Sequence, residues 1–265
     1  MELFWLGQSG FRLRDPDAGG VVFVDPFLTP GATRAWQAPA GPDDLAQASL
    51  VLCTHEHTDH FDRPSIQAAA ARPGARFTLV VPRPIVEDAV ALGVPREPVV
   101  GAQPGETVDV DGVSVHVVPA RHGVNVSDAY NLGEALSGGL VRYLGYVVEV
   151  GGVRAYHSGD CIPFAGQVEQ VRALRPDLAL LPINGRDFYR ETERNIVGNC
   201  DPREAATLAS AVGASVLVPM HWELFPHNRG FPGDLVGYVA TFLPELTVLI
   251  PGRGARLVYQ ASRAG

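Results

Sequence analysis

Short apolar runs rich in β-branched residues recur along the whole chain, and glycine, proline, aspartate or asparagine bounds each of them. This pattern is typical of buried strands separated by turns. The predicted strands are Val21–Val24, Leu50–Cys53, Phe77–Val81, Val113–Val118, Tyr143–Val150, Val153–Tyr156, Leu178–Ile183, Ser215–Pro219, Leu246–Ile250 and Ala255–Tyr259.

Several of the intervening segments are predicted helices: Arg63–Ala71, Pro84–Leu92, Phe164–Leu174, Pro202–Val212 and Gly233–Phe242. The helix at Pro202 has the clearest start, because an aspartate that can cap it precedes a proline at the first helical position. The first half of the chain is rich in strands, whereas the second half alternates strand and helix. Two sheets packed face to face with helices outside would satisfy this pattern. No linker divides the halves, so we expect one domain over residues 1–265.

Two stretches lack any periodic pattern. Pro26–Pro42 is rich in proline, glycine and alanine, and Gly123–Gly139 is rich in glycine, asparagine and serine. Irregular segments of this length inside a compact domain are typical of functional loops or lids. The alternative is a surface excursion without a role.

Composition narrows the classes of protein that fit. The chain has 265 residues, of which 46 % are hydrophobic, and no apolar run approaches the roughly 20 residues that a membrane-spanning helix needs. The N-terminus lacks the basic start and long apolar stretch of a signal peptide. We therefore expect a cytoplasmic protein without a membrane partner, whose three separated cysteines (Cys53, Cys161 and Cys200) are reduced.

The net charge of the chain limits the kinds of partner that it can bind. The formal net charge is −8, which repels phosphate backbones, and no basic run is visible, so we expect no nucleic-acid partner. All 21 basic residues are arginines, which excludes Schiff-base catalysis and a Walker-type phosphate lysine. A small molecule is the expected partner. Whether copies of the chain form a homo-oligomer is left open.

Residues 50–60, LVLCTHEHTDH, lead from a predicted buried strand directly into four potential metal ligands, His55, His57, Asp59 and His60. A metal ion needs several deprotonated nitrogen or oxygen donors converging on one point. His55 and His57 share one side of an extended segment, because side chains alternate along it. An HxHxDH pattern has a low risk of arising by chance. The sequence therefore predicts a metal site here.

This pattern resembles the signature of the metallo-β-lactamase superfamily, in which further ligands follow downstream. Candidates occur in the matching order, each just past a predicted strand: His122 in PARHG, Asp160 in YHSGD and His221 in VPMHW. The resemblance implies an α/β fold, the αββα four-layer sandwich, with the metal site at one edge of the sheets.

The resemblance also implies two divalent ions. The implied ligands are His55, His57 and His122 for one ion, Asp59, His60 and His221 for the other, and Asp160 between them. Two ions about 3.5–4 Å apart share a water and lower its pKa toward 7, so that a metal-bound hydroxide becomes the nucleophile. Asp59 and Asp160 are thus the predicted catalytic residues. Imidazole and carboxylate without thiolate suit Zn²⁺ or Mn²⁺ and leave Fe²⁺ open.

Four further residues have less certain roles. His116, in the middle of a predicted strand, is expected to point away from the core, and His227 is expected on a surface loop. His157 could support a ligand from behind. Asp25, at the end of a predicted strand, would either orient a ligating imidazole or only form a turn.

The substrate is suggested by a second resemblance. The strings WLGQSGF (5–11), YHSGD (156–160), LLPINGRD (180–187), RNIVGN (194–199) and VPMHW (218–222) are similar to the branch that includes the L-ascorbate-6-phosphate lactonases. This implies a lactonase acting on a small phosphorylated or acidic sugar lactone. Arg186, Arg190, Arg194 and Asn184 follow a strand that ends at the expected site. Guanidinium groups suit an anion, so these four are the predicted substrate-binding residues, unless the arginines form a solvated face.

Other functions share the predicted ligands. A small-molecule phosphodiesterase would use the same two ions to attack phosphorus. A thioesterase of the glyoxalase II kind is a second rival. The alternative without catalysis is a metal-binding module that does not turn over. The sequence does not choose the substrate, because one fold supports many chemistries.

Overall fold

The computed structural model describes residues 1–31, 34–95, 97–123, 139–186, 189–193, 197–252 and 254–261, and its strands form two seven-stranded sheets. In spatial order, the first sheet consists of β14 (Arg256–Val258), β1 (Glu2–Gly7), β2 (Gly10–Arg14), β3 (Val21–Val24), β4 (Leu50–Leu52), β5 (Thr78–Pro82) and β6 (Val99–Ala102). The second consists of β13 (Thr247–Val248), β12 (Val216–Met220), β11 (Leu178–Pro182), β10 (Val153–His157), β9 (Leu144–Val150), β8 (Val113–Pro119) and β7 (Thr107–Val110).

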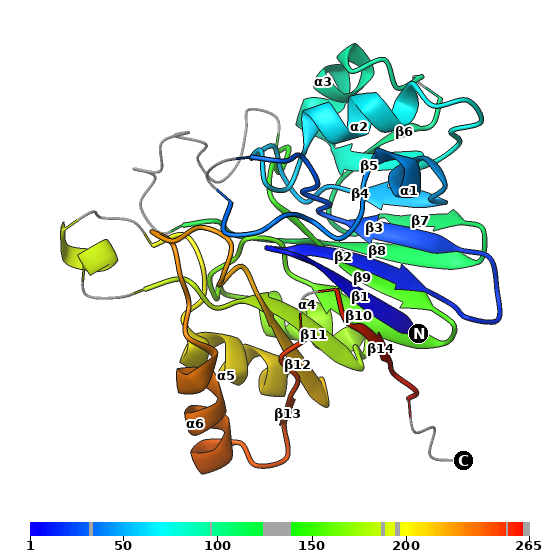
Figure 1. The fold of residues 1–265 in the computed structure, drawn as a ribbon. Coiled ribbons are helices and arrows are strands. Elements are labelled where there is room, and N and C mark those ends of the chain that lie inside the picture. Colours follow the sequence, from blue (N-terminus) through cyan, green and yellow to red (C-terminus); the bar gives the residue numbers. More distant parts are fainter. Residues whose placement is uncertain are drawn as a thin grey trace.

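Helices cover the outer face of each sheet (Figure 1). They are α1 (Pro42–Ala46), α2 (Arg63–Ala70) and α3 (Val86–Ala91) on the first sheet, and α4 (Gln167–Ala173), α5 (Pro202–Val212) and α6 (Pro232–Phe242) on the second. The largest apolar cluster lies between the two sheets and includes Leu52, Tyr146 and Leu180, all fully buried. This arrangement is the predicted αββα four-layer sandwich.

Strand direction collects functional side chains at one edge of this sandwich. In the first sheet β3, β4, β5 and β6 run parallel, and in the second sheet β10, β11, β12 and β13 do so. Strand β8 shares the direction of β10, because each pairs antiparallel with β9. By the same reasoning β1 shares the direction of β3 through β2. The loops after β1, β4, β8, β10 and β12 can therefore meet.

Hydrogen bonds join the two sheets at this edge. The Leu144 amide donates to the Thr54 carbonyl at 3.0 Å, and the Tyr146 hydroxyl donates to the Cys53 carbonyl at 2.7 Å. Both carbonyls belong to the segment that follows β4, so the start of β9 in the other sheet holds that segment in place.

The predicted elements are present, with shifted ends, and some elements were not predicted. The helix α5 has the predicted bounds because Asp201 accepts hydrogen bonds from the Arg203 and Glu204 amides, both at 2.8 Å. By contrast β1, β2, β6, β7 and α1 were missed. Strand β1 is buried along almost its whole length and so lacks alternation, while β6 and β7 are four-residue edge strands with little burial. The predicted strand Leu246–Ile250 is reduced to two residues.

The two irregular segments differ in what can be said of them. In Pro26–Pro42, the Asp62 carboxylate accepts hydrogen bonds from the Leu28 and Thr29 amides at 2.7 Å, and the buried Arg34 guanidinium donates to the Thr29 carbonyl at 2.8 Å. The bonds to Asp62 therefore hold Leu28 and Thr29 against the start of α2. Gly123–Gly139 lies, apart from its two end residues, outside the described residues.

Among the helices that the structure describes, none combines the length and the hydrophobicity that crossing a bilayer requires.

Candidate metal centre

The segment between β4 and α2 carries four of the predicted ligands. All three residues of β4 are buried, and the chain then turns through residues 53–62 before α2 begins. Asp62 caps this helix by accepting from the Ser65 amide. The motif is thus held by a buried strand on one side and a capped helix on the other.

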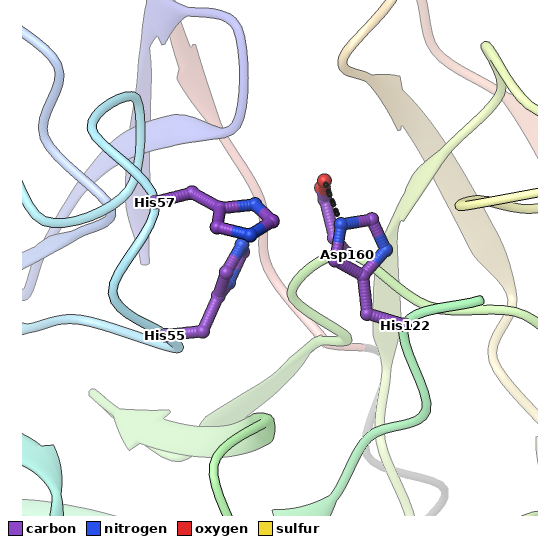
Figure 2. A group of neighbouring side chains, drawn as sticks. All are labelled: His55, His57, His122 and Asp160. Carbon is purple, nitrogen blue, oxygen red and sulfur yellow. Dashed lines mark ion pairs between the residues drawn. The ribbon is translucent and has the colours of Figure 1, made fainter. Parts of the chain in front are cut away.

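The seven predicted ligands converge as two groups, in each of which the ligand atoms lie within 4.8 Å of one another. The first cluster consists of His55, His57, His122 and Asp160, and the second cluster consists of Asp59, His60 and His221. Figure 2 shows the side chains of the first cluster pointing toward one another from separate segments. Their convergence agrees with the sequence prediction.

Asp160 lies between the two clusters. One of its carboxylate oxygens is 3.3 Å from His60 Nε2, and the other is 3.3 Å from His221 Nε2 and 3.6 Å from His122 Nε2. The carboxylate therefore contacts histidines of both clusters, which is the placement that a bridging ligand requires. Asp59 completes the second cluster, with its Oδ2 atom 3.3 Å from His221 Nε2 and 3.7 Å from His60 Nε2.

The turn that carries Asp160 depends on glycine. Gly159 has a φ of 62°, and a Cβ atom there would lie 2.7 Å from the Leu144 carbonyl oxygen and 2.9 Å from Thr54 Cβ. The next amide, that of Cys161, donates to Asn199 Oδ1 at 2.9 Å. Close packing on both sides thus fixes Asp160.

Hydrogen bonds on the far side of the rings orient three of the histidines. The Thr54 hydroxyl donates to Asp25 at 2.7 Å, so its oxygen accepts from His55 Nδ1 at 3.0 Å. His60 Nδ1 donates to Asp25 Oδ2 at 2.7 Å, and His122 Nδ1 donates to the Gly198 carbonyl at 2.7 Å. Each bond places the Nδ1 proton and leaves Nε2 to face the centre, as is common for metal-ligating histidines.

Asp25 is therefore an orienting residue as well as a turn former. Its carboxylate also accepts from the Thr54 amide at 2.8 Å, and its φ of 45° is rare for a residue other than glycine. His157, by contrast, faces Ser9, whose carbonyl lies 2.8 Å from its Nε2, and accepts from the Gly159 amide at 3.1 Å. It supports the turn that carries Asp160 rather than a ligand ring.

The two remaining histidines lie away from the centre. His116 Nδ1 is 3.1 Å from the Thr107 hydroxyl on an exposed part of β8, and His227 is exposed on the loop after β12. Both agree with the sequence prediction.

Two histidines of the first cluster, His55 and His57, favour the neutral form. Burial lowers the pKa of His55 well below its ordinary value, and the neighbouring histidines lower it further. Burial likewise lowers the pKa of His57 to about 4, with His122 adding to the effect. Neutral imidazole is the form that binds a metal ion.

The second cluster has the opposite balance. Burial alone would lower the pKa of His221, but the Asp160 and Asp59 carboxylates outweigh it and raise that pKa to about 10. Burial also opposes charge on His60, yet three carboxylates hold its pKa well above the ordinary value. Burial opposes ionisation of Asp160 as well, but His221 and His60 lower its pKa well below the ordinary range. Protons on His60 and His221 thus balance the negative charge of the carboxylates in and beside this cluster.

The donor set fits a divalent cation. His55 Nε2 is buried and has no hydrogen-bond partner among the described residues, which is costly unless another acceptor or an ion takes the position. Neutral imidazoles and carboxylates without thiolate suit Zn²⁺, Mn²⁺ or Fe²⁺. The seven residues could therefore hold metal, and their geometry does not choose the element.

Two residues of the centre were not predicted as site residues. Gln8, in the turn between β1 and β2, has its Nε2 atom 2.8 Å from Asp59 Oδ2 and 2.9 Å from His221 Nε2. Tyr143 is buried with its ring centroid 5.4 Å from the rings of both His55 and His122. Neither residue type marks a metal site on its own, so only the fold reveals their place.

Three of the four predicted substrate-binding residues, Asn184, Arg186 and Arg190, are described, and they lie on the segment after β11 and contact other parts of the protein. Arg186 Nε is 3.0 Å from Glu204 Oε1, and Arg190 donates to the Asn184 carbonyl at 2.5 Å and the Arg229 carbonyl at 3.1 Å. The buried Asn184 side chain accepts from Asn199 at 3.0 Å. Since Asn199 also accepts from Cys161, Asn184 lies two hydrogen bonds from the Asp160 turn.

These contacts leave the substrate assignment as a prediction. The described bonds give Arg186 and Arg190 structural partners and place neither beside the metal ligands. Arg194 lies outside the described residues.

Comparison with known proteins agrees with this geometry. Residues 21–222 match the family model of the β-lactamase superfamily domain. The chain is 30 % identical over 259 residues to a UPF0173 metal-dependent hydrolase of Myxococcus xanthus, covering 96 % of this chain and 82 % of the relative. It is 33 % identical over 231 residues to one of Methanoculleus marisnigri, covering 86 % and 84 %.

Among solved structures, the fold is similar to that of Igni18, a metallo hydrolase from the archaeon Ignicoccus hospitalis. The TM-score is 0.73 at 23 % identity, with 98 % of both chains covered. The chain therefore belongs to the β-lactamase superfamily and, within it, to the family of UPF0173 metal-dependent hydrolases.

Proposed function

We propose that this protein is a hydrolase that binds two divalent ions and opens a small anionic lactone, a substrate of the L-ascorbate-6-phosphate class. The observation that carries the proposal is the position of Asp160, whose carboxylate contacts histidines of both clusters at 3.3–3.6 Å. A carboxylate in that position suits two ions sharing one ligand.

The chemistry divides between the ions and the chain. Two divalent ions held by these residues would supply a lowered pKa for a bound water and polarisation of the substrate oxygen. The chain orients the imidazoles through Thr54, Asp25 and the Gly198 carbonyl, so that each Nε2 faces the centre. Asp59 has 16 % of its side chain exposed, against 5 % for Asp160. Asp59 is therefore the carboxylate with the better access from solvent.

Recognition of an anionic substrate requires positively charged side chains near the centre. The similarity to lactonases resides in the strings around Gln8, Asp160, Asn184 and His221, and these residues surround or adjoin the centre. Two arginines flank ligand segments: Arg121 immediately precedes His122, and Arg142, whose Nη1 is 2.6 Å from Glu56 Oε1, precedes Tyr143. Both are partly exposed, and guanidinium groups suit phosphate or carboxylate.

The test is a comparison of substrates with defined metal loading. Metal-free protein reloaded separately with Mn²⁺ or Zn²⁺ is assayed on L-ascorbate-6-phosphate, bis-p-nitrophenyl phosphate and a glutathione thioester. We expect the lactone to react fastest. We also expect Asp160→Asn to lose more than about 100-fold in rate, since even outer partners of a metal site cost 10- to 100-fold. The exposed Asp234→Asn serves as the matched control.

Other outcomes would select the rival functions. A phosphodiester hydrolysed faster than the lactone would favour a phosphodiesterase, and a preferred thioester would favour a thioesterase. Full metal occupancy without turnover on any of the three would support a metal-binding module.

A further inference from the structure

Gln8 is a buried carboxamide at the centre that the proposed chemistry has not used. It lies in the tight turn between β1 and β2 and is 1 % exposed. Its side-chain nitrogen contacts two members of the second cluster, Asp59 at 2.8 Å and His221 at 2.9 Å. Asp59 comes from the loop after β4 in one sheet, and His221 follows β12 in the other. The carboxamide therefore links ligands carried by different sheets.

The backbone of Gln8 is held independently of its side chain. Its amide donates to Glu223 Oε1 at 3.1 Å, and its carbonyl accepts from the His221 amide at 3.0 Å and from Trp5 Nε1 at 3.2 Å. Gln8 and His221 have φ values of 52° and 58°, in the left-handed region that residues with a side chain seldom occupy. Such conformations persist where the surroundings determine them, often at functional sites.

An aromatic block lies behind this turn. Trp5 stacks on Trp222 with ring centroids 5.7 Å apart, and Trp36 contacts Trp5 edge-on at 6.0 Å. A side chain at Gly7 would collide with the Trp36 indole, whose nearest atom would be 2.5 Å from its Cβ. The turn thus has little freedom to move, and a side chain projecting from it is presented in a fixed position.

The chemistry of the contact with Asp59 defines the amide orientation. An ionised carboxylate only accepts hydrogen bonds, so the group facing Asp59 is the amide N–H. This bond occupies Oδ2 of Asp59 and fixes the plane of its carboxylate. The same amide nitrogen lies 2.9 Å from His221 Nε2.

We propose that Gln8 is a positioning residue of the second cluster, which holds Asp59 and His221 ready for a divalent ion. The inference rests on the proposed function, because it requires that the second cluster takes up an ion. Its consequence is specific: the affinity of the second cluster depends on the Gln8 carboxamide, whereas the affinity of the first cluster does not.

The test is a titration of metal-free protein with Co²⁺, followed by visible absorption and by competition with a chelator. His57→Ala and His221→Ala identify which uptake step belongs to which cluster. Gln8→Met keeps the length and the backbone bonds but removes both N–H donors. We expect it to weaken the second-cluster step about 10- to 100-fold, the usual cost of losing an outer partner, and to leave the first step unchanged.

Two controls separate positioning from a general loss of structure. Gln167 is also 1 % exposed and donates to the Tyr156 hydroxyl and to the Cys161 thiol, both at 3.2 Å. Gln167→Met therefore removes a buried carboxamide that is bonded to neither Asp59 nor His221, and it should not reproduce a loss confined to the second step. Gln8→Glu keeps the shape but places a carboxylate beside Asp59. We expect it to alter the absorption of the second Co²⁺ only.

The possible failures are distinguishable. Wild-type protein that binds a single Co²⁺ at saturation would contradict the proposed function and, with it, this inference. A two-step wild-type titration that both Gln8 variants reproduce would contradict this inference alone. Equal weakening of both steps in Gln8→Met would show a structural role and would also overturn it.

Discussion

The two clusters occupy one edge of the sandwich and share Asp160, yet they are supported by different chemistry. In the first cluster, a hydroxyl and a backbone carbonyl orient His55 and His122. In the second, the buried Asp25 carboxylate orients His60, and Gln8 contacts both Asp59 and His221.

The protonation of the two clusters follows from this difference. Burial keeps His55 and His57 of the first cluster neutral, because it lowers their pKa values. Carboxylates on both sides of His60 outweigh its burial and raise its pKa. In the first cluster, the neutral rings of His55 and His57 thus offer nitrogen lone pairs to a cation. In the second cluster, a cation must displace the protons of His60 and His221 from their ion pairs with carboxylates. We therefore expect that replacing a residue that contacts both clusters weakens metal uptake by both. Replacing a residue that contacts one cluster directly should mainly weaken uptake by that cluster.

Asp160 is the shared residue, and its replacement should have the largest effect. Asp160→Ala removes the carboxylate that lies 3.3 Å from both His60 and His221 and 3.6 Å from His122. We expect both Co²⁺ uptake steps to weaken by more than about 100-fold, beyond the cost of an outer partner. Asp234→Ala is the control. If only one step weakened, Asp160 would belong to that cluster alone.

The turn before Asp160 should also act on both clusters. Gly159→Ala places a methyl group 2.7 Å from the Leu144 carbonyl oxygen at a φ of 62°. We expect a loss of about 2–4 kcal/mol in the free energy of unfolding from strain and overlap together, with both uptake steps weakened. Gly213→Ala, at a φ of 86° with nothing within 4 Å of the added Cβ, should lose only about 1 kcal/mol. Urea denaturation of the metal-free variants measures both values, and equal losses would contradict the packing argument.

Asp25 contacts the second cluster directly, through His60, and reaches the first cluster only through Thr54. Asp25→Asn replaces an acceptor of the His60 Nδ1 proton with an amide, and we expect the second uptake step to weaken about 10- to 100-fold. The first step should change less, because His55 contacts Asp25 only through Thr54. Asp177→Asn is the matched control. The Asp177 carboxylate accepts a hydrogen bond of 2.8 Å from the Arg154 amide, and this contact involves none of the seven candidate ligands. A larger loss in the first step would reverse the assignment.

Much of this comparison could be predicted from the sequence, because the HxHxDH motif is local and its strand is apolar. The ligands His122, Asp160 and His221 could be placed through the family resemblance and their positions after strands. The role of Gln8 could not, since it arises when the β1–β2 turn reaches β12, more than 200 residues away in the chain. The sequence does not decide whether Asp25 orients an imidazole or only forms a turn, because its contact with His60 is tertiary.

Proton release should show the difference between the clusters most directly. At pH 7 the raised pKa values of His60 and His221, the latter about 10, keep both histidines protonated in the metal-free protein. An ion needs their Nε2 lone pairs, so uptake by the second cluster should release about two protons. Uptake by the first cluster should release none from His55 and His57, whose pKa values are lowered, that of His57 to about 4.

The sign of the pH dependence follows from these protons. Each proton released makes the affinity about tenfold higher per unit rise in pH while the group is still protonated. The second step should therefore strengthen steeply from pH 6 to 8, whereas His55 and His57 add no such dependence to the first step over the same range. Calorimetric titration in buffers of different ionisation enthalpy counts the protons of each step. Equal release in the two steps would mean that the carboxylates around His60 and His221 do not hold the protons that separate the second cluster from the first.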